Sequence, residues 1–153
     1  MQGSCPPILI GGGGKRVLPY AAKVADIVGI NATMSAGAVG PEAISTMTAE
    51  AVDAKVDIVR EASGDRINDI EMNIRAFLVN VTDDANGAIS RLAKGMGVEE
   101  SMVANTPFAL MGPPSKLIND LLERRERWGF SYVIVGGEDV EAFAPVVAAL
   151  AGK

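Results

Sequence analysis

The sequence contains no histidine and only one cysteine, Cys5. Without histidine the chain cannot build a Cys/His zinc site or a His-based catalytic triad from its own residues. A single cysteine cannot form an internal disulfide, which fits a reducing cytoplasm. We therefore expect neither structural zinc nor His-dependent hydrolysis from this chain.

Basic residues are in the minority, with 14 Lys and Arg against 19 Asp and Glu, and they are scattered along the chain. Such a distribution gives no basic surface for nucleic acid. No apolar run approaches the roughly 20 residues of a membrane span, and residues 1–7 lack the features of a signal peptide. We expect a soluble cytoplasmic protein, one domain over residues 1–153, with neither nucleic acid nor membrane as a partner.

Short apolar segments alternate with amphipathic ones. The apolar segments predict four strands, at about residues 8–10, 27–30, 70–81 and 132–135. The third exceeds the usual strand length, so we expect it to be bent. Helical spacing predicts helices at about residues 17–25, 44–62, 85–96, 117–128 and 140–150.

Regular alternation of strands and helices implies parallel strands joined by right-handed crossovers, and hence an α/β fold. A doubly wound open sheet and part of an eight-stranded barrel share this pattern. Periodicity by itself leaves both open.

Four consecutive glycines, at 11–14, join the end of the first strand to a helix that begins after Lys15 and Arg16. Glycine backbone lets N–H groups approach an anion, and the helix N-terminus adds partial positive charge. The spacing is not that of a Walker loop, and the dinucleotide fingerprint lacks its third glycine. The pattern predicts a phosphate-binding turn, with a tight structural turn as the alternative.

The sequence around this turn resembles a known family. Residues 6–18, Pro-Pro-Ile-Leu-Ile-Gly-Gly-Gly-Gly-Lys-Arg-Val-Leu, are similar to the middle of luciferase-like monooxygenases, especially the actinobacterial group that uses the deazaflavin coenzyme F420. Further similar segments follow in the same order, at residues 21–29, 55–66, 121–132 and 143–147. The resemblance covers nearly the whole chain and implies a (β/α)8 TIM barrel whose last four strands are present here, with the cofactor at their carboxyl ends.

The resemblance also implies which residues bind the cofactor, either coenzyme F420 or FMN. The positions that match the family's contacting residues are Gly13, Gly14, Arg16 and Val17. Gly12 is an adjacent candidate, and we add Lys15 on its charge alone. No catalytic acid or base is identified.

The chain departs from the family in lacking the front half of the barrel, since an eight-stranded barrel typically needs about 250 residues. We therefore expect a carboxyl-terminal half-barrel that is incomplete as an isolated enzyme. Either it is part of a longer gene product, or two copies associate as a homo-oligomer and cover the exposed sheet edges.

Two functional hypotheses follow. The first is the carboxyl-terminal part of a luciferase-like, flavin- or F420-dependent oxidoreductase that contributes the cofactor phosphate loop. The alternative is a non-catalytic half-barrel that binds a phosphorylated ligand or forms a homodimer.

Other polar residues have simpler structural interpretations. Asn31, Thr33 and Ser35 follow the second strand, where they could bind a ligand, but a solvated loop is the interpretation that we favour. Asn73 and Arg75 alternate with apolar residues, so in a barrel they would point inward, and packing is the simpler role.

Charged runs and large apolar residues also have simple interpretations. The pair Asp83-Asp84 predicts a helix cap rather than a metal site. The run at residues 123–127 predicts a solvated helix face with pairs between residues three and four apart. Trp128 and the methionines predict packing.

Overall fold

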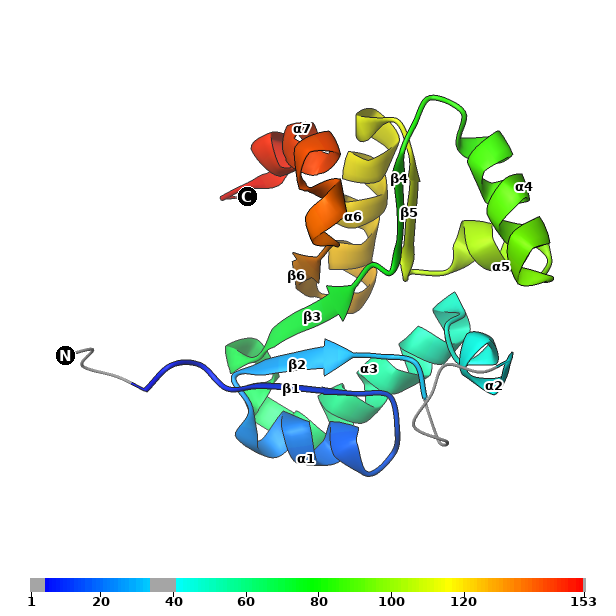
Figure 1. The fold of residues 1–153 in the computed structure, drawn as a ribbon. Coiled ribbons are helices and arrows are strands. Elements are labelled where there is room, and N and C mark those ends of the chain that lie inside the picture. Colours follow the sequence, from blue (N-terminus) through cyan, green and yellow to red (C-terminus); the bar gives the residue numbers. More distant parts are fainter. Residues whose placement is uncertain (1–4, 34–40, 153) are drawn as a thin grey trace.

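Four parallel strands form the main sheet of the computed structural model, which describes residues 5–33 and 41–152. Ser35 lies outside the described residues. The strand order β1-β2-β3-β6 follows the sequence, with bounds Leu9–Gly12, Ile27–Ile30, Glu71–Arg75 and Phe130–Ile134. A second sheet pairs β4 (Leu78–Val81) in parallel with β5 (Ala109–Gly112), as Figure 1 shows.

The described parts of the chain contain seven α-helices. Their bounds are α1 (Val17–Val24), α2 (Pro41–Ser45), α3 (Ala49–Ser63), α4 (Ala85–Met96), α5 (Glu100–Asn105), α6 (Pro114–Trp128) and α7 (Val140–Leu150). Short 3-10 helices cover Gly64–Asp69 and Gly137–Asp139. None of these helices is long and apolar enough to cross a membrane.

Glycines follow the ends of three of the helices. Gly64, Gly97 and Gly129 follow α3, α4 and α6 with φ values of 54°, 67° and 80°. These positive values are the region that side chains with a Cβ rarely adopt. Asp84 caps α4 by accepting a hydrogen bond from Gly87 N at 2.9 Å, which confirms the predicted cap.

The helices α1 and α3 cover one face of the main sheet. Alternate residues of the central strands, Val28 and Ile30 of β2 and Met72 and Ile74 of β3, form one core with α1 and α3. Trp128, at the end of α6, joins the same core. A doubly wound sheet reverses its strand order and carries helices on both faces. The sequential strand order is the arrangement of a barrel segment, and the α/β fold with parallel strands and crossover helices is confirmed.

The single bent strand predicted at residues 70–81 is wrong. It is two strands, because the chain changes partners at Ala76 and Phe77. Ala76 N still bonds to Ile134 O of β6, whereas Phe77 N bonds to Phe108 O beside β5. The partner strand β5 is fully buried and was not predicted, because its four residues lie between prolines at 107 and 113.

The predicted solvated face at residues 123–127 is also wrong in part. Arg124 is buried and donates hydrogen bonds to Pro107 O at 2.8 Å and Ala109 O at 2.6 Å. Arg127 pairs with Asp53 of α3, at 2.6 Å, on a different helix. The start of β5 presents backbone carbonyls to α6, and the long Arg124 side chain satisfies them. Leu122 of the same helix is exposed.

Candidate functional site

The glycine turn lies at the carboxyl edge of the main sheet. The chain leaves β1 at Gly12 and enters α1 at Val17, and the loop after β2 begins beside it at Asn31 (Figure 1). Asn31 N donates to Gly12 O at 2.9 Å, so the two loops leave the sheet in contact. This is the edge at which barrel and open α/β folds bind their ligands.

Two glycines of the turn are required by close packing. A Cβ on Gly13 would lie 2.3 Å from Ala32 O and 2.5 Å from Asn31 O, and both atoms belong to the backbone. A Cβ on Gly12 would lie 2.6 Å from a methyl group of Val17. A tight structural turn, the alternative to a phosphate-binding turn, therefore explains why glycine occupies positions 12 and 13.

Gly14 has no such packing role. A Cβ at this position would meet nothing within 4 Å among the described residues, and its φ does not require glycine. Within the described parts of the chain, the backbone here borders open space. A ligand could therefore approach the N–H groups of this part of the turn.

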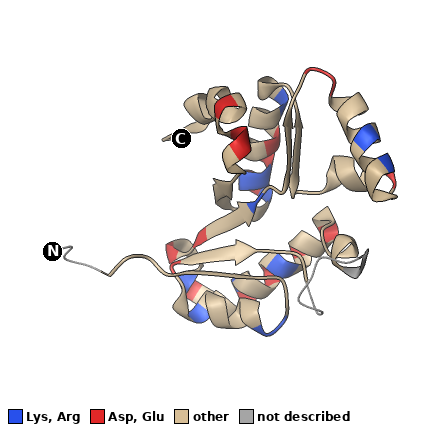
Figure 2. Ribbon diagram, viewed as in Figure 1, with Lys and Arg blue, Asp and Glu red and all other residues tan. Residues whose placement is uncertain are grey.

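Unpaired backbone N–H groups and positively charged side chains both occur in the glycine turn. The N–H groups of Gly14, Lys15 and Arg16 donate to no described residue. No side chain of the described residues caps the start of α1, and the first turn of this helix carries no acidic residue. Lys15 and Arg16 are exposed, and Figure 2 shows blue at this turn. Such a helix start can hold an anion through backbone N–H groups and the helix dipole.

A hydrogen-bond network behind the turn fixes its shape. Thr33 Oγ1 donates to Gly13 O at 2.6 Å, and Thr33 N donates to Thr46 Oγ1 at 2.8 Å. Lys55 of α3 donates from Nζ to Asn31 O at 2.9 Å and to Thr46 O at 2.7 Å. These contacts join both loops of the candidate site to the α2–α3 segment.

Lys55 is a residue that the sequence analysis did not single out. It is buried, and this burial lowers its pKa from 10.5 to about 8. The available signal was a lysine placed between Val52, Val56 and Val59, on the apolar stripe of the helix. Lysine is almost never fully buried without a partner, so this placement marks an unusual environment.

The other polar residues singled out from the sequence lie as follows. Asn31 is half-buried, and its Nδ2 lies 2.9 Å from where a Cβ on Gly11 would be. Asn73 is buried and donates from Nδ2 to Tyr132 O at 2.9 Å, which agrees with a packing role. Arg75 is exposed, with its guanidinium 5.4 Å from the centre of the Phe77 ring. The described residues contain no group of His, Cys, Asp and Glu side chains that could hold a metal.

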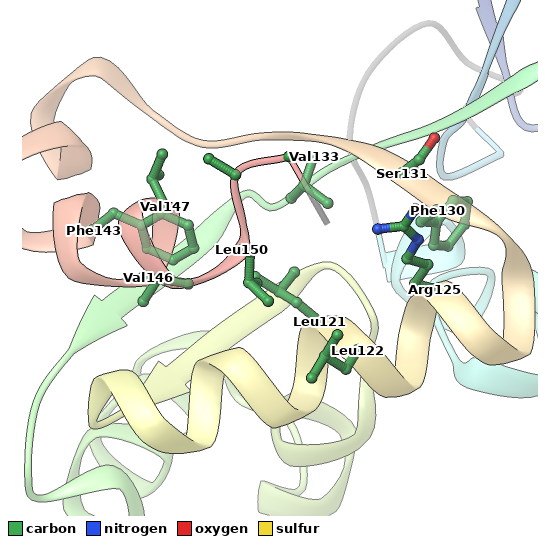
Figure 3. Close-up of a pocket in the computed structure, with 12 residues that line it drawn as sticks. Leu121, Leu122, Arg125, Phe130, Ser131, Val133, Phe143, Val146, Val147 and Leu150 are labelled. Carbon is green, nitrogen blue, oxygen red and sulfur yellow. The ribbon is translucent and has the colours of Figure 1, made fainter.

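A largely apolar pocket of about 280 Å³ lies elsewhere, between α6, β6 and α7 (Figure 3). Phe143, Val146 and Val147 of α7 face Leu121 of α6 and Val133 of β6 across it. None of its lining residues belongs to the glycine turn or to the loop after β2. The pocket is therefore separate from the candidate site.

Comparisons with solved structures support the fold. The chain superposes on a coenzyme F420 dependent tetrahydromethanopterin reductase from Methanopyrus kandleri with a TM-score of 0.63 and 14% identity, covering 92% of this chain and 48% of that one. It superposes on a long-chain alkane monooxygenase, LadA, with a TM-score of 0.61 and 16% identity, covering 95% of this chain and 41% of that one. The chain has the fold of these enzymes.

The likeness extends over less than half the length of either enzyme. No protein-family model matches the sequence, and no curated protein matches it. The comparisons therefore confirm the α/β architecture. They agree with the fold that the sequence's resemblance to luciferase-like monooxygenases implies.

Proposed function

We propose that this chain is the carboxyl-terminal half of a luciferase-like oxidoreductase and that its glycine turn binds the phosphate of coenzyme F420 or FMN. The observation that carries the proposal is the set of unpaired N–H groups at Gly14, Lys15 and Arg16, at the carboxyl edge of the sheet. The fold shared with an F420-dependent reductase and a monooxygenase supports it.

Each residue of the turn has a distinct role in this proposal. Gly14 offers its N–H group and open space to the phosphate, whereas Gly12 and Gly13 allow the close packing that shapes the turn. Arg16 adds positive charge or a bidentate contact, and Val17 fixes the start of α1 beside Gly12. When bound, the flavin or deazaflavin ring would supply the hydride chemistry, and the protein would supply binding and orientation.

The glycine turn does not distinguish FMN from coenzyme F420, because it would contact the phosphate, which both cofactors carry. The rest of the ring pocket and the substrate site would come from strands other than these. Catalysis is therefore proposed for the complete barrel, with this chain as its cofactor-anchoring half.

The proposal is tested by titrating the purified chain with FMN and with coenzyme F420 and following absorbance or fluorescence. We expect saturable binding of at least one of them, and we expect Gly14→Asp to weaken it at least about tenfold by placing a carboxylate beside the phosphate. Gly95→Asp is the matched control, because a Cβ on Gly95 also meets nothing within 4 Å. Absence of binding to both cofactors at high micromolar concentration would refute the phosphate site.

A second candidate function is assembly with another copy of the chain. The edge strands β1 and β6 each have one neighbour in the main sheet, and Leu9 and Tyr132 on them are exposed. Unpaired strand edges and exposed apolar residues favour association. Sedimentation over a range of concentrations tests this function, and a monomer at every concentration would rule it out.

A further inference from the structure

We propose that Lys55 is a fixed positive charge behind the glycine turn that makes this site select a phosphorylated ligand over an uncharged one. The inference rests on the proposed function and adds a residue to it that does not touch the ligand. Lys55 is therefore a positioning residue, and its effect is electrostatic.

The side chain is enclosed and carries no neutralising partner among the described residues. Lys55 is 6% exposed, and both of its hydrogen bonds go to backbone carbonyls, Asn31 O and Thr46 O. No carboxylate of a described side chain forms an ion pair with it. A buried ammonium without a counter-charge is costly, because its hydration is lost and only dipoles replace it.

The ammonium lies directly behind the turn. Its Nζ is 2.9 Å from Asn31 O, and the same oxygen lies 2.5 Å from the position of a Cβ on Gly13. One carbonyl group therefore separates the charge from the glycine that precedes the unpaired N–H groups. Lys15 and Arg16 also belong to this turn, but they are exposed and water screens their charges more strongly.

A phosphate at the turn would supply the missing negative charge. The attraction between the two charges acts partly through protein rather than water, which strengthens it. A ligand that lacks the phosphate gains nothing from this charge. The hydrogen bonds of Lys55 also order the two loops, but that ordering would favour charged and uncharged ligands alike.

The experiment compares each phosphorylated cofactor with its phosphate-free counterpart, FMN with riboflavin and coenzyme F420 with its deazaflavin chromophore. The affinity ratio of each pair is measured for wild type, Lys55→Arg and Lys55→Gln at pH 7. We expect Lys55→Gln to lower the ratio about tenfold and Lys55→Arg to retain most of it. Equal weakening of both members of a pair, or an unchanged ratio, would show that Lys55 has only a structural role.

The wild-type protein provides a second measurement that does not depend on a variant folding. The FMN phosphate is almost fully ionised above about pH 7, so its charge is constant there. Because burial lowers the pKa of Lys55 to about 8, the FMN-to-riboflavin ratio is expected to fall as the pH rises from about 8 to 10. A ratio that stays constant over a pH range in which the stability profile shows Lys55 losing its proton contradicts the inference. Failure of the wild type to bind either phosphorylated cofactor would instead be a failure of the proposed phosphate site itself.

Discussion

Arg127 donates two hydrogen bonds to the carboxylate of Asp53, from Nε at 3.0 Å and from Nη2 at 2.6 Å. The neighbouring Trp128 donates a third, from Nε1 at 2.7 Å. The hydrogen bond from Arg127 is the main cause that lowers the pKa of Asp53. Through these contacts the end of α6 is attached to α3, which lies more than 70 residues earlier in the chain.

Replacing Asp53 is expected to weaken this attachment. Asp53→Ala removes the acceptor of Arg127 and of the buried Trp128 indole, so we expect the free energy of unfolding to fall by about 1 to 2 kcal/mol. The value is modest because the Asp53 side chain is 40% exposed and water screens the pair. Urea unfolding followed by tryptophan fluorescence measures it.

Asp57→Ala is the matched control for Asp53. Asp57 lies on the same helix, its side chain is 72% exposed, and its pair with Arg60 is longer, at 3.5 Å. The expected change is within about 0.5 kcal/mol. Equal effects of the two substitutions would contradict the assigned role of Asp53.

Arg124 is expected to be more important for stability than its place in a charged run suggests. Arg124→Met keeps much of the side-chain volume but leaves the carbonyls of Pro107 and Ala109 without their donor. We expect a loss of about 2 to 4 kcal/mol, measured by chemical unfolding. Arg91→Met, at an exposed arginine of α4, should change stability by no more than about 0.5 kcal/mol. An equally small effect of Arg124→Met would show that its buried hydrogen bonds contribute little.

Adjacent glycines of the turn should differ in their tolerance of alanine. Gly13→Ala forces backbone apart at Asn31 and Ala32, and we expect it to lower the free energy of unfolding by about 1 to 3 kcal/mol. Gly14→Ala enters open space and should be neutral or slightly stabilising. Thermal unfolding of the two variants separates these outcomes, and a stable Gly13→Ala protein would argue against the close packing of the two loops.

Stability should rise with pH above neutrality because of Lys55. Burial lowers its pKa to about 8, against 10.5 for an ordinary lysine, so between these values the unfolded chain binds more protons than the folded chain. The free energy of unfolding should therefore increase from about pH 8 to 10.5, by on the order of 2 to 3 kcal/mol. Lys55→Met should lack this increase. A flat profile in the wild type would mean that Lys55 keeps an ordinary pKa.

Local patterns in the sequence predict much of the fold. The helix α7 has the predicted bounds, and the helices before Gly64, Gly97 and Gly129 end where glycine permits a positive φ. The glycine turn also lies where the alternation of strand and helix places it, at the carboxyl end of a parallel strand. These features depend on residues close together in the chain, and periodicity and backbone geometry specify them directly.

Features that depend on residues far apart in the sequence could not be predicted from local patterns. The break between β3 and β4 occurs because Ala76 and Phe77 bond to strands that follow much later in the sequence. The burial of Arg124 depends on carbonyls 15 and 17 residues away, and that of Lys55 depends on Asn31, 24 residues away.

The sequence by itself determined the class of fold, the order of most of its elements and the position of the glycine turn, because these follow from local spacing. Only the tertiary structure decided which charged side chains are buried and which strand pairs with which. The physical reason is that these long cationic side chains are buried where backbone carbonyls accept their hydrogen bonds. Folding brings those carbonyls to the side chains from separate segments of the sequence.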